Sequence, residues 1–306
     1  MTRTHVIFLV LLAALLAAPF VVYPVLMMKV LCFALFACAF NLLLGFTGLL
    51  SFGHAAFLGM AAYTTGYAMT HLPVTPEAAL ILGTLASAAL GVVFGGLAIR
   101  RQGIYFAMIT LALAQMVYFF CLQAPFTGGE DGLQGVPRGR LFGLLDLRND
   151  MAMYYFVLAI FVAGFLVIYR TIHSPFGQIL KAIRENEPRA LSLGYDVDRY
   201  KLMAFVLSAA LAGLAGATKT LVLGFATLTD VHWGTSGEVV LMTLVGGVGT
   251  VLGPIAGAVI IVVLQNELAD KVGSWVTVIM GAIFVATVLA FRRGIVGEIA
   301  ARLGNR

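Results

Sequence analysis

The stretch LVLLAALLAAPF, residues 9–20, decides the fold class because it is continuously apolar and does not alternate between apolar and polar residues. The strands of a transmembrane barrel need such an alternation. Apolar runs of about 20 residues, long enough to cross a bilayer as a helix, recur throughout the 306-residue chain. The chain is 61% hydrophobic and 11% charged, whereas soluble domains carry about 25% charged residues. The sequence therefore predicts an all-α, polytopic membrane protein.

The apolar runs predict about ten membrane-spanning helices, some of them broken at Gly-rich segments. Seven spans are expected at 6–26, 29–46, 54–71, 78–98, 104–122, 151–170 and 202–224, and region 238–291 fits three shorter ones with breaks near Gly253 and Gly273. The first is interpreted as a span and not as a cleaved signal peptide, because its apolar run continues past Pro19 and Pro24. Lys29 and Lys219 lie near span ends, where we expect their ammonium groups to snorkel towards water.

The distribution of basic residues predicts the orientation of a single permease domain, 1–306. Even numbers of spans separate the basic positions, so that one side of the membrane can hold them all: Arg3, Arg100, Arg101, Lys181, Arg184, Arg189, Arg199, Lys201, Arg292, Arg293, Arg302 and Arg306. The positive-inside rule makes that side the cytoplasm. Both termini, the tail 292–306 and segment 174–195 are then cytoplasmic, and loop 123–150 is extracytoplasmic.

Two Gly-rich segments are unusual for simple spans. Segment 41–59, NLLLGFTGLLSFGHAAFLG, also contains polar residues, and segment 244–259, LVGGVGTVLGPIAGAV, also contains a proline. Backbone groups that such residues free must be satisfied by protein or by a water-filled cavity, and interrupted helices in corresponding halves point to a transport pathway. Small residues also permit close helix packing. Packing is the favoured interpretation of the glycines alone, whereas in 41–59 both interpretations stay open.

Segment 174–195 predicts two short helices with a corner between them. Ser174 can cap a helix that begins at Pro175, and an apolar stripe follows at Phe176, Ile179, Leu180 and Ile183. Pro188 can open a second helix, which Gly194 would close in the left-handed conformation. Acidic residues offset the basic ones here, whereas lipid-bound helices favour a basic excess. We therefore expect this segment to contact a protein.

The sequence contains no recognisable catalytic, metal-binding or nucleotide-binding motif, and we expect neither enzyme activity nor a cofactor. The nearest candidate for a phosphate loop, GLAGATKT at 213–220, has Thr218 where a glycine is required. The polar residues that fall within or beside spans are the candidates for a substrate pathway, each with an alternative structural role: Asn41, Thr47, Ser51, His54, Gln115 and Glu238. Glu130 and Asp131, in an outer loop with the composition of a turn, are candidates for docking a protein.

Five stretches together resemble the LivM-type permeases of bacterial branched-chain amino acid ABC importers. They are NLLLGFTGLLSFGHAAFLGMAAY (41–63), GIYFAMITLALAQ (103–115), TGGEDGLQGV (127–136), SPFGQILKAIRENEPRALSLGYDVDRYKLMAFVLSAALAGLAGA (174–217) and SGEVVLMTLVGGVGTVLGPIAGA (236–258). The resemblance implies an inner-membrane permease that pairs with a LivH-type permease, two LivG/LivF-type cytoplasmic ATPases and a periplasmic binding protein.

The resemblance further implies that segment 174–195 is the coupling segment that sits in a cleft of the ATPase. Importer permeases often carry an EAA-x-x-x-G signature there, of which PRALSLG, 188–194, keeps only Ala190 and Gly194. The coupling candidates are Arg184, Glu185, Glu187, Arg189, Ala190 and Gly194. ATP hydrolysis would occur in the partner subunits, and the substrate would be a branched-chain or other hydrophobic amino acid. A urea or amide permease of the same superfamily stays open, and so, with less support, does an ion-coupled secondary transporter.

Overall fold

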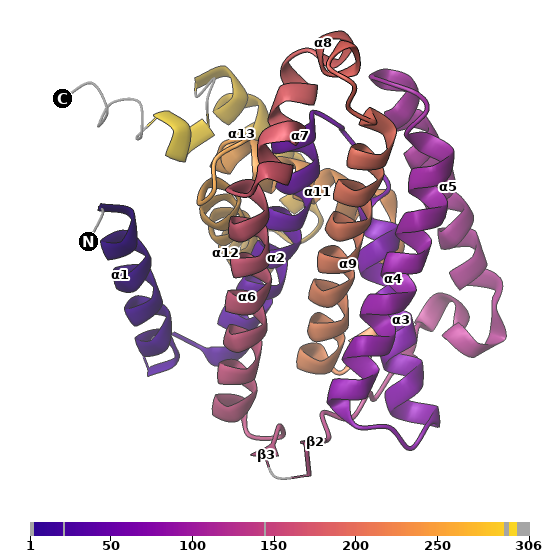
Figure 1. Cartoon of the computed structure of the whole chain (residues 1–306). Helices are drawn as coiled ribbons and strands as arrows, with labels where there is room; N and C mark the ends of the chain where they lie inside the picture. Colours follow the sequence, from indigo (N-terminus) through magenta and orange to yellow (C-terminus); the bar gives the residue numbers. More distant parts are fainter. Residues whose placement is uncertain (1–2, 21, 144, 291–293, 299–306) are drawn as a thin grey trace.

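The computed structural model describes every residue except 1–2, 21, 144, 291–293 and 299–306 (Figure 1). Its α-helices are α1 (Arg3–Ala17), α2 (Pro24–Thr47), α3 (His54–His71), α4 (Pro76–Ala98), α5 (Ile104–Gln123), α6 (Asp150–Ile172), α7 (Pro175–Glu185), α8 (Glu187–Ser192), α9 (Val197–Leu223), α10 (Leu228–Val231), α11 (Trp233–Gly246), α12 (Gly253–Val272) and α13 (Val276–Ala290). Two antiparallel strand pairs join β1 (Leu133–Gln134) to β4 (Phe225–Ala226) and β2 (Arg140–Leu141) to β3 (Leu145–Asp146).

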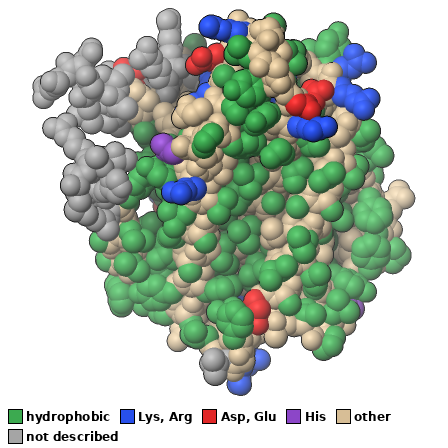
Figure 2. Space-filling model, in the orientation of Figure 1, with side chains coloured by type: hydrophobic (Ala, Val, Ile, Leu, Met, Phe, Trp, Pro, Cys, Tyr) green, Lys and Arg blue, Asp and Glu red, His purple; other side chains and the backbone are tan. Residues whose placement is uncertain are grey.

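The all-α, polytopic membrane fold is confirmed. Five helices, α2, α4, α5, α6 and α9, are long and apolar enough to cross a bilayer. Charged side chains gather towards the two ends of the molecule, and most of the side chains in view between them are hydrophobic (Figure 2). Figure 1 shows α7 and α8 at one end of the bundle and the β2–β3 hairpin at the other, so that segments 174–195 and 123–150 lie at opposite ends.

The boundary between the first two spans differs from the prediction, which continued the first span to residue 26. Helix α1 ends at Ala17 and α2 begins at Pro24. A proline in the first turn of a helix needs no hydrogen-bond partner for its nitrogen, and it cannot continue a preceding helix. Pro24 therefore starts α2, and the predicted boundary was placed too late. In the tail 292–306, the predicted basic residues Arg292, Arg293, Arg302 and Arg306 lie outside the described residues.

Helix α2 is the centre of the bundle. It contacts α6, α9, α11 and α12, and nearly all of its residues from Met28 to Thr47 are buried. A helix that is apolar on every side is favoured in such a position. Helix α5 is also apolar on every side, but it packs against the bundle along a narrow face and leaves Met108, Met116 and Phe119 exposed.

Small residues allow α3, α4 and α9 to approach one another closely. A Cβ atom at Gly216 of α9 would collide with the Leu58 carbonyl of α3, and one at Gly213 would collide with Ser87 of α4. Without a hydrophobic driving force between helices in lipid, close backbone approach through small residues is a principal source of association energy. Helix α9 is thereby held in the core beside α2.

The Gly-rich segment 244–259 contains the end of α11, the turn 247–252 and the start of α12. A Cβ atom at Gly246 would collide with the carbonyl of Gly253, and one at Gly257 with the carbonyl of Met242. The two helices run antiparallel with their backbones in contact, which agrees with the packing interpretation. Gly247 and Gly249 have φ values of 124° and 77°, and such backbone conformations favour glycine.

We predict that Gly216→Ala lowers the free energy of unfolding by about 1–3 kcal/mol, the usual cost of overpacking a core. The matched control is Gly96→Ala on α4, where a Cβ atom would meet nothing within 4 Å. That control should be neutral or stabilise the protein by up to about 1 kcal/mol, the difference in helix propensity. Denaturation in mixed micelles measures both. Equal stabilities of the two variants would contradict the close packing of α9 on α3.

Candidate functional site

The first interruption in the bundle lies between α2 and α3. Helix α2 ends at Thr47, capped by Gly48 in the left-handed conformation (φ 76°). Helix α3 begins at His54, whose Nε2 lies 2.9 Å from the Oγ of Ser208. Ser208 is the twelfth of the 27 residues of α9, about 16 Å along that helix at 1.5 Å per residue. Residues 48–53 therefore turn back into the bundle, and α3 begins near its middle.

Side chains satisfy the backbone at the start of α3. The Phe52 amide donates to the Oγ1 of Thr110 on α5 (3.2 Å), and the Gly53 amide donates to the Oγ of Ser51 (3.2 Å). The Ala55 amide donates to the Oγ of Ser236 on α11 (2.9 Å). Inside a bilayer each of these groups needs a protein or water partner. Ser51, predicted as a pathway candidate, is fully buried here and bonds to the interruption itself.

His54 is fully buried between α2, α3 and α9. Ser208 donates its hydroxyl proton to the Ala39 carbonyl (2.5 Å), and the His54 Nε2–H donates to Ser208 as a consequence. The Nδ1 atom then carries a lone pair, and no hydrogen-bond partner for it occurs among the described residues. Three phenylalanine rings surround the imidazole edge-on, those of Phe40, Phe57 and Phe205. In this conformation His54 connects α3 to α2 and α9.

Asn41 and Thr47 are buried near the end of α2. The Gly249 amide donates to the Oδ1 of Asn41, and the Nδ2 of Asn41 donates to the Thr250 carbonyl, both at 2.9 Å. The Thr47 hydroxyl donates to the Leu43 carbonyl within its own helix. Asn41 thus connects α2 to the α11–α12 turn.

A second interruption, which was not predicted from the sequence, lies between α9 and α11. Helix α9 ends at Leu223 and is capped by Gly224 (φ 77°). Strand β4 and the one-turn helix α10 follow, and Val231 of α10 packs closely against Gly59 of α3, so the chain has turned back into the bundle. Helix α11 then begins at Trp233 and has only 14 residues. The polar run TLTDVHWGTSGE, 227–238, was the available signal.

An ion pair closes this second interruption. The Lys219 ammonium of α9 donates to the Oδ1 of Asp230 on α10, and the two side chains are only 9% and 4% exposed. The other carboxylate oxygen of Asp230 accepts the Thr227 amide at 3.4 Å. The Lys219 ammonium also lies 5.7 Å from the centroid of the Phe33 ring. The prediction that the Lys219 ammonium extends towards water is therefore wrong, because the ammonium pairs with the buried Asp230 carboxylate instead.

Two further charged residues lie close enough to interact electrostatically with this pair. Lys29 and Glu238 each interact with both Lys219 and Asp230. Glu238 accepts a hydrogen bond from the Nε2 of Gln265 on α12 at 3.0 Å. The cluster brings two basic and two acidic side chains together, and pairing of opposite charges offsets part of the cost of charges within a membrane.

The remaining predicted residues lie at the surface of the bundle. Gln115 is half-buried on α5, and within the described residues its amide has no hydrogen-bond partner. Glu130 and Asp131 are exposed in a short 3₁₀ turn between two glycines with positive φ, Gly128 and Gly132. This turn belongs to the loop 123–150.

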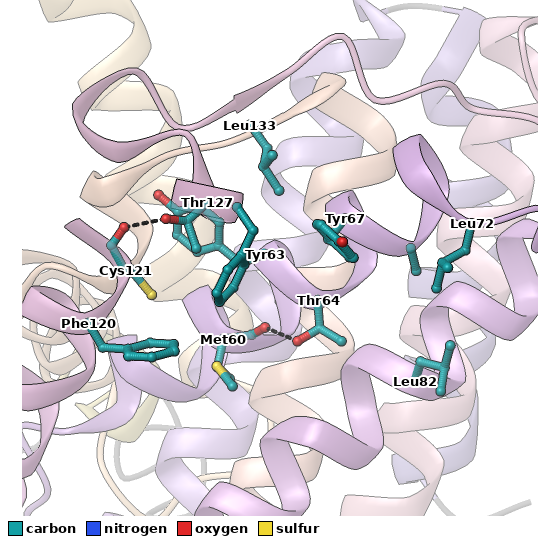
Figure 3. Close-up of a pocket in the computed structure, with 12 residues that line it drawn as sticks. Met60, Tyr63, Thr64, Tyr67, Leu72, Leu82, Phe120, Cys121, Thr127 and Leu133 are labelled. Carbon is teal, nitrogen blue, oxygen red and sulfur yellow. Dashed lines mark hydrogen bonds between the residues drawn. The ribbon is translucent and has the colours of Figure 1, made fainter. Parts of the chain in front are cut away.

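A cavity of about 500 Å³ lies where α5 diverges from α3 and α4 (Figure 3). Its lining is almost entirely apolar or aromatic: Met60, Tyr63, Thr64, Tyr67, Ala68, Leu72, Leu82, Phe120, Cys121, Phe126, Thr127 and Leu133. The Thr64 hydroxyl donates to the Met60 carbonyl (2.7 Å) and the Thr127 hydroxyl to the Cys121 carbonyl (2.5 Å), as the dashed lines in Figure 3 show. The buried Tyr63 hydroxyl has no partner among the described residues. None of the six predicted pathway residues lines this cavity.

The α7–α8 hairpin has the two-helix form that the sequence predicted. The Gly177 amide donates to the Ser174 side chain (3.3 Å). Leu180 and Ile183 are buried on the inner face of α7. Asn186 caps α8 by accepting the Arg189 amide at 3.0 Å. Gly194 ends the hairpin with a φ of 86°. No group of three or more potential metal ligands occurs in the part of the chain that the structure describes.

The six predicted coupling residues occupy different positions on the hairpin. Ala190 is buried in a small core with Ile183 and Val197. Glu187 forms an ion pair of 2.7 Å with Lys201 of α9, and Arg184 donates to the Gly45 carbonyl of α2. The side chains of Glu185 and Arg189 are exposed, with no partner among the described residues. The hairpin is therefore anchored on α2 and α9 and has a free outer surface.

Comparisons with known proteins agree with this architecture. The family model described as the branched-chain amino acid transport system / permease component matches residues 22–288. The chain belongs to this family. No solved structure matches it.

Several relatives are bacterial permeases. The chain is 30% identical over 253 residues to the high-affinity branched-chain amino acid transport system permease protein LivM of Salmonella typhimurium, and 29% identical over 253 residues to LivM of Escherichia coli. In both cases the alignment covers 75% of this chain and 60% of the relative, so the chain spans about 60% of the length of these relatives. It is also 29% identical over 243 residues to the autoinducer 2 import system permease protein LsrC of Salmonella choleraesuis, covering 76% of this chain and 67% of that one.

We predict that Asp230→Asn lowers the free energy of unfolding by about 3–5 kcal/mol, because it leaves the Lys219 ammonium buried and unpaired. The double variant Lys219→Met/Asp230→Leu should recover most of that loss. The matched control is Lys271→Met, whose partner Glu267 lies 3.7 Å away in an exposed pair worth about 0–1 kcal/mol. Denaturation in mixed micelles measures all three. A double variant no more stable than Asp230→Asn would contradict the ion-pair assignment.

Proposed function

We propose that this chain is a membrane-spanning permease subunit of an ABC importer for branched-chain amino acids, driven by ATP hydrolysis in partner subunits. The observation that carries the proposal is the α7–α8 hairpin, a stiff and anchored structure with a free outer surface, in a chain that belongs to a permease family. The function requires no catalytic group in this chain. It requires a surface that a motor protein can hold and move.

The outer surface of the hairpin suits a protein partner. Leu191 and Leu193 are 55% and 68% exposed, and the side chains of Glu185 and Arg189 are exposed on the same hairpin. Figure 2 shows charges of both signs gathered at this end of the molecule. Exposed leucines beside charges of both signs are typical of a contact that an apolar cleft can bury. A lipid surface would favour a basic excess instead. We therefore assign this surface to the ATPase.

The other partners follow from the same assignment. A LivH-type second permease, two LivG/LivF-type ATPases and a periplasmic binding protein would complete an assembly in the bacterial inner membrane. The hairpin and both termini would face the cytoplasm. Loop 123–150 lies at the opposite end of the bundle and would face outwards, where the exposed Glu130 and Asp131 are available to the binding protein.

Two of the six predicted pathway residues, Gln115 and Glu238, are half-buried, and we retain them as candidates for lining the substrate pathway. Asn41, Thr47, Ser51 and His54 are buried and bonded within the helices. We propose that these four hold the first interruption in place. A pathway beside it would open when the ATPases move the hairpin.

The apolar lining of the bundle favours a solute with an aliphatic side chain. The cavity beside α5 exposes apolar and aromatic groups, which would give little hydrogen bonding to urea or an amide. An ion-coupled transporter needs intramembrane acids available to its ion, but Asp230 is paired with Lys219 and Glu238 is bonded to Gln265. Because one relative is named for autoinducer 2 import, the substrate itself must be measured.

We predict that Leu191→Asp weakens binding of the ATPase at least tenfold, because it places an unpaired charge in the centre of the contact. Co-purification of the ATPase with the detergent-solubilised permease measures this. The matched control is Arg199→Met, which alters a side chain 82% exposed just beyond the hairpin and should leave binding unchanged. Full ATPase recovery with the Leu191→Asp variant would contradict the docking assignment.

We predict that the complete complex in proteoliposomes, with its binding protein and ATP, accumulates radiolabelled leucine. Excess isoleucine or valine should compete for that uptake, and urea should not. Omission of ATP is the control for passive leakage. ATP-dependent uptake of urea in place of leucine would support the amide permease alternative and contradict this substrate assignment.

A further inference from the structure

Arg184 is an exposed residue of the α7–α8 hairpin, and its guanidinium group reaches the end of α2. Its Nη1 donates to the Gly45 carbonyl in the last turn of α2. Its aliphatic stem packs over Gly48, and a Cβ atom at Gly249, in the α11–α12 turn, would lie 3.3 Å from the same Nη1. The Arg184 side chain therefore contacts the end of α2 and lies beside the α11–α12 turn.

The Gly45 carbonyl is one of the last four of α2, which have no partner within the helix. The Gly48 and Leu49 amides both donate to the Leu43 carbonyl and leave that of Gly45 free. A cation near the carboxyl end of a helix also interacts favourably with the helix dipole. Arg184 thus caps the helix that precedes the first interruption, and the cap comes from a different element of the fold.

The α11–α12 turn is fixed to the same point. Asn41 bonds to the Gly249 amide and to the Thr250 carbonyl. A Cβ atom at Gly45 would collide with Asn41 and with the Gly249 backbone, so α2 and the turn meet with no side chain between them. Any displacement of the α2 end must therefore displace this turn.

A second contact between α7 and α2 does not hold the two helices in the same way. The Lys181 ammonium lies 5.7 Å from the centroid of the Phe46 ring. A cation over a ring face has little directional restraint, whereas a guanidinium hydrogen bond to a carbonyl fixes both partners. Arg184 provides the directional connection.

We propose that Arg184 is a positioning residue that transmits displacement of α7 to the end of α2, and through Asn41 to the α11–α12 turn. The proposal rests on the proposed function, because it assumes that a partner moves the hairpin. Arg184 is one of the predicted coupling residues, and its proposed role is on the side of the hairpin that contacts α2. The outer surface of Glu185, Arg189, Leu191 and Leu193 then holds the partner, and Arg184 delivers the motion.

Hydrogen–deuterium exchange in the isolated permease tests the connection without any partner. In Arg184→Met, which keeps the stem over Gly48 and loses the donor, peptides covering 43–53 and 246–253 should exchange at least threefold faster than in the unaltered protein. Arg184→Lys should restore part of the protection, and Arg199→Met should match the unaltered protein. Unchanged exchange of both peptides in Arg184→Met would overturn the inference.

Transport by the reconstituted complex tests the consequence. Arg184→Met should assemble with the ATPases and retain ATP hydrolysis within about threefold, while substrate uptake falls at least tenfold and Arg184→Lys recovers part of it. Loss of assembly together with hydrolysis would make Arg184 a docking contact and overturn the inference, as would normal uptake. Absence of uptake by the unaltered complex would instead contradict the proposed function, and the exchange experiment would still decide the role of Arg184.

Discussion

Hydrogen bonding of the backbone inside the bilayer is the constraint on which the rest of this structure depends. An interrupted helix frees amide and carbonyl groups that lipid cannot satisfy. At the first interruption the partners are hydroxyl groups from neighbouring helices, those of Thr110 and Ser236. At the second interruption the buried ion pair of Lys219 and Asp230 holds α10 against α9. Each break thus depends on side chains from helices remote in sequence, and helices that separate must release these bonds.

The two interruptions have a common form. Helices α2 and α9 both end at a left-handed glycine, and short segments then turn back to start α3 and α11 inside the bundle. His54 and Ser208 connect α3 to α9, and Ser236 connects α11 to α3. The paired breaks are therefore bonded to each other. This is the arrangement expected of a transport protein in which half-helices lie beside the pathway, and it explains why polar residues gather here in so apolar a chain.

The sequence predicted the apolar helices, the break after α2 and the two-helix hairpin, because hydropathy, glycine and capping residues are local signals, but it placed the boundary between α1 and α2 too late. It did not predict the break after α9, since residues 227–238 resemble a polar loop followed by a span. It also misplaced the Lys219 side chain, because Asp230 approaches only when the chain folds back. The amphipathic pattern of α7 identified its buried face, but the target of Arg184 depends on where α2 ends. Contacts between elements distant in the sequence therefore could not be predicted from local sequence signals.

In the proposed mechanism a partner holds the α7–α8 hairpin, and the hairpin moves the interrupted helices. Cryo-electron microscopy of the assembled transporter, with and without a non-hydrolysable ATP analogue, tests this most directly. Leu191 and Leu193 should be buried against the ATPase, and α7, the end of α2 and the α11–α12 turn should move together between the two states. Exposure of α8 to solvent, or movement of α7 past a stationary α2, would contradict it.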